Sequence, residues 1–260
     1  MASPTSKHLD QLKRLSDFKI PVLVEKPISN SFKKAKKTIS YAESRNNIIL
    51  TGYMLRFNPA VIEFKRLIDS KFLGQIYKIS VDIHSFMPGW HPYENYENLY
   101  ASKKKLGGGV ILTESHEIDL LVWFFGIPNK AISLNSKTSN CNIDVEDTAS
   151  SVLKYYSKDK NFLVTINQCF TSMTIMREIK IYGPKGFLKL DLINNCIYYE
   201  TKQKLKKLFS INRLNRNDLF LSQINYFIKC VNNKMNNKNK ILDSGLQTSY
   251  LLSLLKKSNK

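Results

Sequence analysis

Residues 106–126, LGGGVILTESHEIDLLVWFFG, combine a glycine turn with an apolar helix that carries a histidine. The three consecutive glycines permit backbone conformations that a side chain would block, and they let main chain approach closely. Apolar residues at helical spacing follow, and Gly126 with Pro128 forms a helix stop. A histidine on such a buried helix, here His116, is suited to rigid general acid or base work. The alternative is a core histidine without a catalytic role.

Length and composition fit one large domain or two small ones, with enough apolar residues to build a core. The chain has 260 residues, of which 43% are hydrophobic, and no apolar run reaches the length of a membrane span. Its beginning lacks the apolar centre of a secretory signal. The four cysteines are scattered, so neither a disulfide framework nor a metal site is indicated. We therefore expect a cytoplasmic protein without membrane contact and without a metal.

The chain is strongly basic, with 40 Lys+Arg against 21 Asp+Glu and a formal net charge of +19. The lysines are dispersed, and neither a nucleic-acid-binding motif nor interleaved aromatic residues organise them. Nucleic-acid binding is therefore the least favoured of the functions that we consider. A basic surface would still attract anionic small molecules such as nucleotide-linked sugars.

The hydrophobic pattern changes near residue 74. Before it, a helix at 6–15, a strand at 21–25, a helix at 31–46 and a strand at 48–53 alternate. This is typical of the back half of a doubly wound α/β sheet, whose ligands bind at the carboxyl ends of strands. An amphipathic helix is expected at 56–73. After it, period-two strands are expected at 75–84, 131–139, 148–156, 162–170, 178–182, 187–192 and 196–200, with closing helices at 218–231 and 242–255. We therefore expect a large antiparallel sheet.

The signature of dinucleotide binding is missing. No G-x-G-x-x-G occurs in the chain, so an opening strand, its phosphate loop and a ribose-binding acidic residue are not found. We expect the chain to open where the fourth strand of such a domain ends, as an N-terminally truncated protein would.

Several ordered motifs resemble the glucose–fructose oxidoreductase and inositol dehydrogenase (Gfo/Idh/MocA) family. They are VLVEKP at 22–27, YMLRFNP at 53–59, GQI at 74–76, the glycine turn with its HEIDL helix, EDTA at 146–149 and IYGPKG at 181–186. The resemblance covers nearly the whole chain. It implies a partial Rossmann-like NAD(P)-binding domain at 1–56, then at 57–260 an α+β substrate and oligomerisation domain. That domain would have a large, mostly antiparallel open sheet and C-terminal helices that pack back.

The resemblance also implies hydride transfer between NAD or NADP and a sugar, nucleotide-sugar or polyol hydroxyl. The catalytic residues would be Lys26, which would hydrogen-bond the reacting hydroxyl, and His116, which would carry the proton. The residues implied to bind the cofactor are Ser3, Pro4, Thr5, His8, Glu25, Lys26 and Pro27. Those implied to bind the substrate are Arg56, Trp90, His91, Glu114 and Asp119. Thr113 stands where many members have an aspartate, and Glu114 is the neighbouring carboxylate that could replace it.

Three functions remain open on the sequence. The first is an oxidoreductase whose front half lies on a separate chain or is lost from the gene. The second is a catalytically inactive remnant that binds a sugar or serves as a structural subunit. The third is a binder of nucleic acid or another anionic polymer. In the first two cases we expect a homo-oligomer formed through the open sheet.

Overall fold

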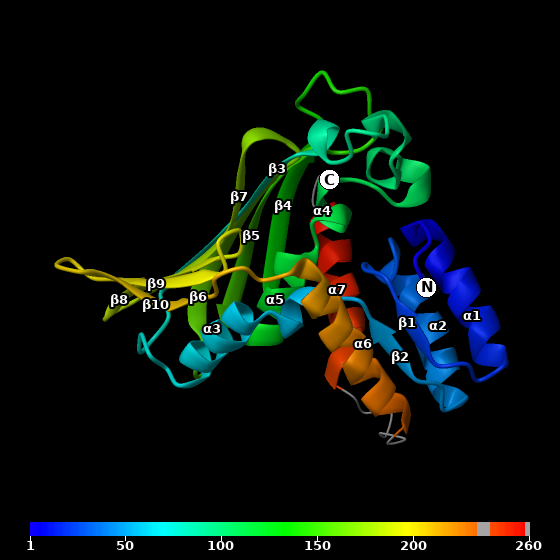
Figure 1. Cartoon of the computed structure of the whole chain (residues 1–260), viewed down its shortest axis with the longest axis horizontal. Helices are drawn as coiled ribbons and strands as arrows, with labels where there is room; N and C mark the ends of the chain where they lie inside the picture. The colour runs from blue at the N-terminus through cyan, green and yellow to red at the C-terminus, as the bar shows by residue number, and fades with distance from the viewer. Residues whose placement is uncertain (233–239, 258–260) are drawn as a thin grey trace.

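The first unit of the chain is a small parallel sheet covered by helices. The computed structural model describes residues 1–232 and 240–257 (Figure 1). The strands β1 (Val22–Val24) and β2 (Ile49–Thr51) pair in parallel. The helices α1 (His8–Asp17) and α2 (Phe32–Ser44) pack on them. Apolar runs of this kind, buried on both faces, are typical of parallel strands.

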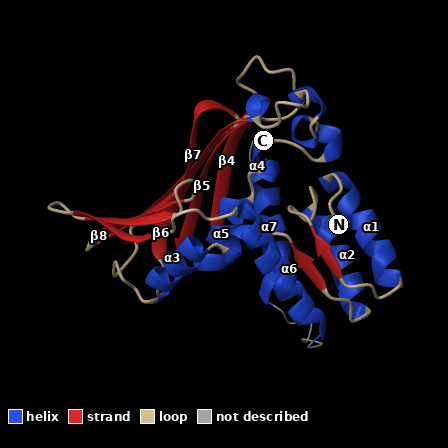
Figure 2. Ribbon diagram, viewed as in Figure 1, coloured by secondary structure: helices blue, strands red, loops and turns tan. Residues whose placement is uncertain are grey.

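The second unit is built on an eight-stranded sheet (Figure 2). Its order is β10-β9-β8-β7-β3-β6-β5-β4. Among the described strands, β3 and β6 run parallel and the other neighbours run antiparallel. The strands are β3 (Lys78–Phe86), β4 (Lys130–Ser136), β5 (Thr148–Tyr156), β6 (Asn161–Cys169), β7 (Thr171–Gly183), β8 (Gly186–Asp191), β9 (Cys196–Glu200) and β10 (Leu205–Ser210). The expected α/β fold with a large, mostly antiparallel sheet is thus confirmed.

Helices cover one face of the large sheet. They are α3 (Pro59–Asp69), α4 (Val110–Thr113), α5 (His116–Phe125), α6 (Arg216–Asn232) and α7 (Lys240–Lys257). Short 3-10 turns lie at η1 (Thr5–Lys7), η2 (Met54–Phe57), η3 (Met87–Gly89), η4 (Tyr96–Asn98), η5 (Tyr100–Ser102) and η6 (Lys104–Leu106). Helix α3 contacts β8, β9 and β10, whereas α4 contacts β5 and β6. None of the described helices is long and apolar enough to span a bilayer.

Helix α7 joins the two units. It contacts α2 and β2 of the first unit and α4, α5 and β4 of the second, and it lies between them in Figure 1. A side chain at Gly245 would come within 2.5 Å of the Thr51 hydroxyl, so the helix and β2 approach closely. Leu251, Leu252 and Leu255 are buried in the larger core. Residues at the end of the chain therefore fix the position of the N-terminal unit.

Two features of the second unit differ from the sequence expectation. The helix expected within 106–126 is interrupted after Thr113, because Glu114 leaves the helical region at φ −96° and ψ 52°. The segment Thr113, Glu114 and Ser115 contains two residues whose side chains compete with helix hydrogen bonds. Strand β10 was not expected from the sequence, because its lysines leave only a weak alternation of apolar and polar residues.

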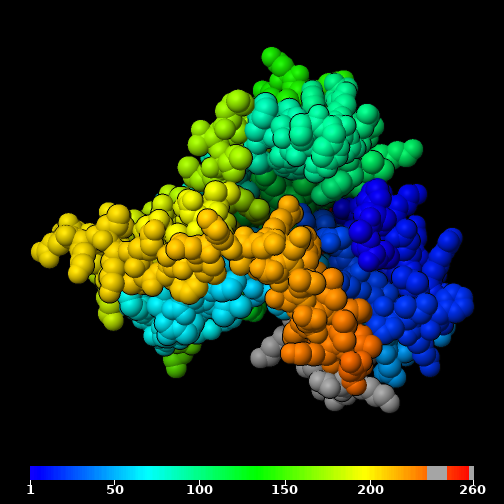
Figure 3. Space-filling model, viewed as in Figure 1, coloured from blue at the N-terminus to red at the C-terminus, as the bar shows by residue number. Residues whose placement is uncertain are grey.

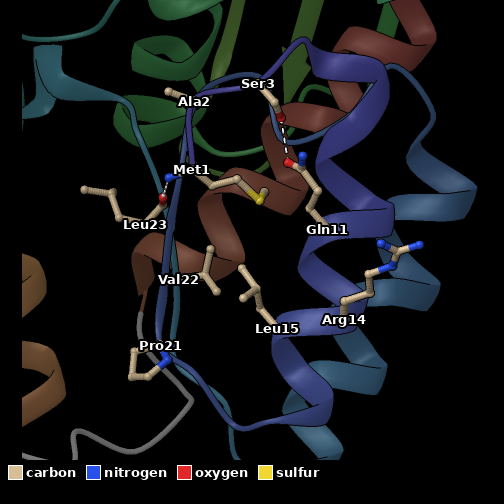
Figure 4. A pocket seen from close by; sticks show the side chains of 9 residues that line it. All are labelled: Met1, Ala2, Ser3, Gln11, Arg14, Leu15, Pro21, Val22 and Leu23. Carbon is tan, nitrogen blue, oxygen red and sulfur yellow. Dashed lines mark hydrogen bonds between the residues drawn. The ribbon is translucent and has the colours of Figure 1, made fainter.

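The outer edge of β1 is hydrogen-bonded to the first residue of the chain. The Met1 amino group donates to the Leu23 carbonyl at 2.6 Å, and the Glu25 N–H donates to the Met1 carbonyl at 2.9 Å. These two bonds lie on the side of β1 opposite β2, in the pattern of a parallel bridge. A hollow of about 540 Å³ lies between this edge and α1 (Figure 4). Its walls include apolar side chains of Met1, Leu15 and Val22.

Candidate active site

Lys26 links the two units at the carboxyl end of β1. Its Nζ donates to the Thr113 carbonyl at 2.5 Å, across the boundary between the small sheet and α4. Burial, and after it the charge of Arg177, lowers the pKa of the Lys26 ammonium to about 8. Carboxylates of Glu25, Glu117 and Glu114 act in the opposite direction on that pKa. A lysine that titrates in this range can both donate and accept a proton near neutral pH.

His116 is the first residue of α5 and is 8% exposed. The Tyr53 ring meets its imidazole edge-on, with ring centroids 5.9 Å apart. Burial lowers the pKa of His116 well below its usual value, and the charges of Lys26, Arg177 and Arg216 lower it further. The imidazole is therefore neutral at neutral pH, and it can accept or donate a hydrogen bond without carrying charge.

Two carboxylates flank the histidine in the sequence and have different partners. Glu117 is fully buried and pairs with Arg177 of β7, at 2.6 and 2.7 Å from two guanidinium nitrogens. Glu114 is 8% exposed and accepts a hydrogen bond from the Ser85 hydroxyl at 2.5 Å. Burial raises the pKa of Glu114 to about 8, against the opposing effect of the Ser85 hydrogen bond.

Unsatisfied polar atoms gather around this cluster. Glu114 Oε2, His116 Nδ1, Glu117 Oε2 and Gln168 Oε1 are buried and make no hydrogen bond to any described residue. Buried polar groups are nearly always paired in folded proteins, and exceptions concentrate where a ligand or water binds. The concentration of such atoms on the segment that carries His116 therefore makes it a candidate binding site.

A cavity of about 300 Å³ opens beside Lys26. It is lined by Ala2, Ser3, Pro4, Thr5, Glu25, Lys26 and Tyr100. His8 holds its two walls together, because one ring nitrogen lies 2.8 Å from the Ser3 carbonyl and the other 3.0 Å from the Pro27 carbonyl. The residues implied to bind the cofactor therefore lie in or directly behind one cavity, and their binding role stays a prediction.

The glycine turn brings the second unit against this cavity. Gly107 has φ +85°, and a side chain there would lie 3.0 Å from Thr5. A side chain at Gly108 would overlap the carbonyl oxygens of Tyr100 and Ala101. In Figure 3 the N-terminal residues lie directly against the segment that precedes the turn. The turn therefore needs glycine for close approach of backbone, as the sequence indicates.

Arg56 and Asp119 pair with each other. The guanidinium contacts both carboxylate oxygens, at 2.7 and 2.9 Å, and both side chains are at most 5% exposed. Thr248 of α7 donates to the same carboxylate at 2.8 Å, and the Arg56 guanidinium lies 5.3 Å from the Trp123 ring. This pair joins η2, α5 and α7, so its groups are engaged within the fold.

The two predicted residues of the aromatic loop, Trp90 and His91, each contact another aromatic ring. Trp90 packs edge-on against Phe170, with centroids 5.2 Å apart, and belongs to the border of the large core. His91 lies 5.6 Å from the exposed Tyr93 ring. The charge of Lys26 acts on His116, and the binding roles of Trp90 and His91 stay predictions.

Comparison with known proteins agrees with this architecture. Residues 61–189 match the model of the GFO/IDH/MocA C-terminal domain. This domain places the chain in the Gfo/Idh/MocA family. Among curated proteins, D-xylose 1-dehydrogenase (NADP(+)) 2 of Haloferax volcanii is 23% identical over 154 residues, which is 59% of this chain and 45% of that protein. The chain spans about half the length of the curated relatives that it matches.

Solved structures of the same fold cover the whole chain. The WlbA dehydrogenase from Bordetella pertussis, in complex with NADH and UDP-GlcNAcA, has a TM-score of 0.79 at 19% identity. The aldose-aldose oxidoreductase from Caulobacter crescentus, complexed with glycerol, has a TM-score of 0.83 at 16% identity. Each comparison covers 99% of this chain and 75% of the other. At these identities the likeness shows the fold.

Sequence reasoning missed several residues of this candidate site. Arg177 and Gln168 share the inward face of their strands with buried apolar residues, for example Ile179 on β7 and Ile166 on β6. A polar residue at an inward position of an alternating strand was the available signal. Tyr100 carried no such signal, because it lies in a 3-10 turn. Burial, and after it the charge of Glu25, raises the pKa of Tyr100.

Proposed function

We propose that the chain supplies the proton-transfer and substrate-binding part of an NAD- or NADP-dependent oxidoreductase. Its substrate would be a sugar, nucleotide sugar or polyol, and its reaction the oxidation of a hydroxyl group or the reverse. The observation that carries the proposal is Lys26, which has a pKa of about 8, lines a cavity and carries a charge that acts on a neutral histidine. The family relationship supports the reaction type, and the names of the relatives support the substrate class.

The cavity fits one end of a nicotinamide dinucleotide. Its walls offer the Ser3 and Thr5 hydroxyls, the Glu25 carboxylate and the Lys26 ammonium, which suit a ribose and a carboxamide. A bound oxidised nicotinamide would accept a hydride from the substrate carbon. The sequence contains no glycine-rich phosphate loop, so these residues account for the nicotinamide end alone.

The pKa values of Lys26 and His116 favour other roles than those implied by the resemblance. Lys26 would take the proton, and His116 would orient the substrate hydroxyl. At pH 7 about a tenth of a lysine with a pKa near 8 is uncharged, and this fraction can take the proton as the substrate O–H bond breaks. The Thr113 carbonyl then accepts a hydrogen bond from the new ammonium. His116, whose lowered pKa keeps it neutral, would orient the hydroxyl through a hydrogen bond.

The test is binding and turnover with defined cofactors. We expect the purified chain to bind NADH and NADPH in the millimolar range, because two or three charge-assisted bonds to the pyrophosphate are missing. Each such bond contributes roughly 1.5–3 kcal/mol, and 1.4 kcal/mol is about tenfold in affinity. Fluorescence titration measures this directly. Micromolar binding by the chain alone would contradict the expectation and would require another phosphate site.

A front half that supplies the glycine loop is part of this proposal. The parallel bridge between Met1 and β1, and the apolar hollow beside it, support a further parallel strand on this edge. Adding a G-x-G-x-x-G-bearing front half from a relative should restore tight cofactor binding and sugar oxidation. Lys26→Met should abolish that turnover, whereas Lys158→Met, at an exposed loop residue, should retain it.

The alternative is a catalytically inactive subunit that binds a sugar or serves a structural role. The apolar hollow beside the outer edge of β1 is the observation that favours it. Under this alternative, cofactor binding and turnover remain undetectable when the front half is added, while sugar binding to the chain persists.

A further inference from the structure

Glu114 occupies the interruption between α4 and α5. Gln168 of β6 holds this interruption open, because its side-chain amide donates to the carbonyls of Val110 and Glu114 at 3.2 and 3.1 Å. With the backbone turned in this way, the Glu114 carboxyl reaches the end of β3, where Ser85 donates to Oε1. Its other oxygen is buried without a hydrogen bond to any residue that the structure describes. The backbone of Glu114 is thus held from β6 and its side chain from β3.

Burial is the main factor that disfavours an ionised Glu114, and the Glu117 charge adds to it, whereas the charges of Arg177 and Lys26 favour the ionised form. Glu117, three residues along, is a buried anion, and Arg177 is held by that anion at 2.6 Å. Lys26 acts on Glu114 from the loop after β1, and its Nζ is already bonded to the carbonyl of the preceding residue, Thr113. Removing a carboxylate from water without a paired cation is costly, so the group keeps its proton instead.

We propose that Glu114 is a positioning residue for Lys26, held as an uncharged carboxylic acid so that no anion at this point stabilises the lysine ammonium. This inference rests on the proposed role of Lys26. An ionised Glu114 would favour the charged lysine, since opposite charges at short range favour each other's ionised form. A neutral acid leaves the lysine free to lose its proton to solvent and then to accept one from the substrate hydroxyl.

The two groups are therefore coupled. Burial lowers the pKa of Lys26 to about 8 and raises that of Glu114 to about 8, so the two protons are released over the same range. Below that range the site holds a neutral acid and an ammonium. Within it, a carboxylate that forms at Glu114 opposes loss of the proton from Lys26, and above it both protons have been released. The Glu25 and Glu117 carboxylates and the Arg177 guanidinium also act on Lys26 and are present in every variant described below.

The test follows both groups by NMR in the full chain without cofactor. Carbon-13 labels on the glutamate carboxyls and on the lysine side chains report each titration, with Glu114→Gln and Lys26→Met assigning the two resonances. We expect a glutamate signal that titrates near pH 8 and is lost in Glu114→Gln. In that variant the Lys26 midpoint should move to lower pH, because the carboxylate that appears in this range is absent. Glu94→Gln, at an exposed loop position, is the matched control and should leave Lys26 unchanged.

A second variant keeps the test decisive if Glu114→Gln does not fold. Ser85→Ala removes the hydrogen bond that favours the ionised carboxylate, so the Glu114 titration should move to higher pH. A Glu114 signal that titrates below about pH 5, its ordinary range, would overturn the proposal. An unchanged Lys26 midpoint in Glu114→Gln would overturn it as well. Neither measurement needs turnover, so failure of the oxidoreductase assignment would be seen separately.

Discussion

At the scale of single residues, the partly buried Lys26 should make the stability of the chain depend on pH. Its folded-state pKa is about 8 against 10.5 for an ordinary lysine. Between these values the unfolded chain binds more protons than the folded one, so stability rises as pH increases from 8 to 10.5. Lys26→Met removes this group, and the difference in unfolding free energy between wild type and variant should change by up to about 3 kcal/mol across that range.

Urea unfolding at pH 7 and at pH 10.5 measures this difference. Lys158→Met is the control, because that lysine lies exposed in a loop and should show no such change. If the difference in unfolding free energy between wild type and Lys26→Met is the same at both pH values, the expectation is wrong. The ammonium of Lys26 would then be well solvated.

Residue types in the sequence indicated which segments form the candidate site. They did not indicate which polar side chains pair with each other inside the fold. The motif that contains Lys26 and the turn before His116 were both read from glycine, proline and charge at fixed spacing. Arg56 and Asp119 look equally suited to a ligand in the sequence, yet they form a buried ion pair 63 residues apart. Pairing of this kind depends on the approach of η2 to α5, which no local pattern specifies.

At the scale of elements, a substitution in the glycine turn tests the packing of the second unit against the cavity. A methyl group at Gly108 would overlap two backbone carbonyls, which cannot move aside as a flexible side chain can. Gly108→Ala should therefore destabilise the fold, by the roughly 1–3 kcal/mol of an overpacked core or more. Gly126→Ala is the comparison, since it has no atom within 4 Å and carries only the conformational cost of its φ of +79°.

Thermal unfolding of both variants gives the answer. The larger loss is expected for Gly108→Ala, together with a disturbed environment of Tyr100, whose carbonyl the new methyl would meet. Equal losses in the two variants would mean that the turn can shift away from the 3-10 segment at little cost.

The elements that sequence predicted well are those with a clear period. Both short apolar strands, the helices of the first unit and most strands of the large sheet follow from it. The interruption at Glu114 did not, because it is held by Gln168 from a strand 54 residues away. Strand β10 was also not predicted. It is an edge strand with exposed lysines, so few of its side chains are buried and its sequence lacks a clear alternation.

At the scale of the whole molecule, the uncovered face of the large sheet carries an apolar patch. It consists of Ile132 and Leu134 on β4, Val152 on β5 and Leu163 on β6, which are 63%, 72%, 45% and 45% exposed. Ile132 lies opposite Val152, and the strand period places Leu134 on the same face. Contiguous exposed apolar side chains of this kind mark interaction surfaces.

We therefore expect the chain to associate with a second copy through this face. The double variant Ile132→Glu and Leu134→Glu places two like charges on it, which a self-complementary interface would bring together with their copies. Light scattering after size exclusion should show a multiple of 30.1 kDa for the wild type and a mass closer to one chain for the variant. Leu205→Glu is the control, because Leu205 is 63% exposed on β10, at the other end of the sheet. A wild type that runs as a single chain, or a double variant whose mass is unchanged, would contradict this interface.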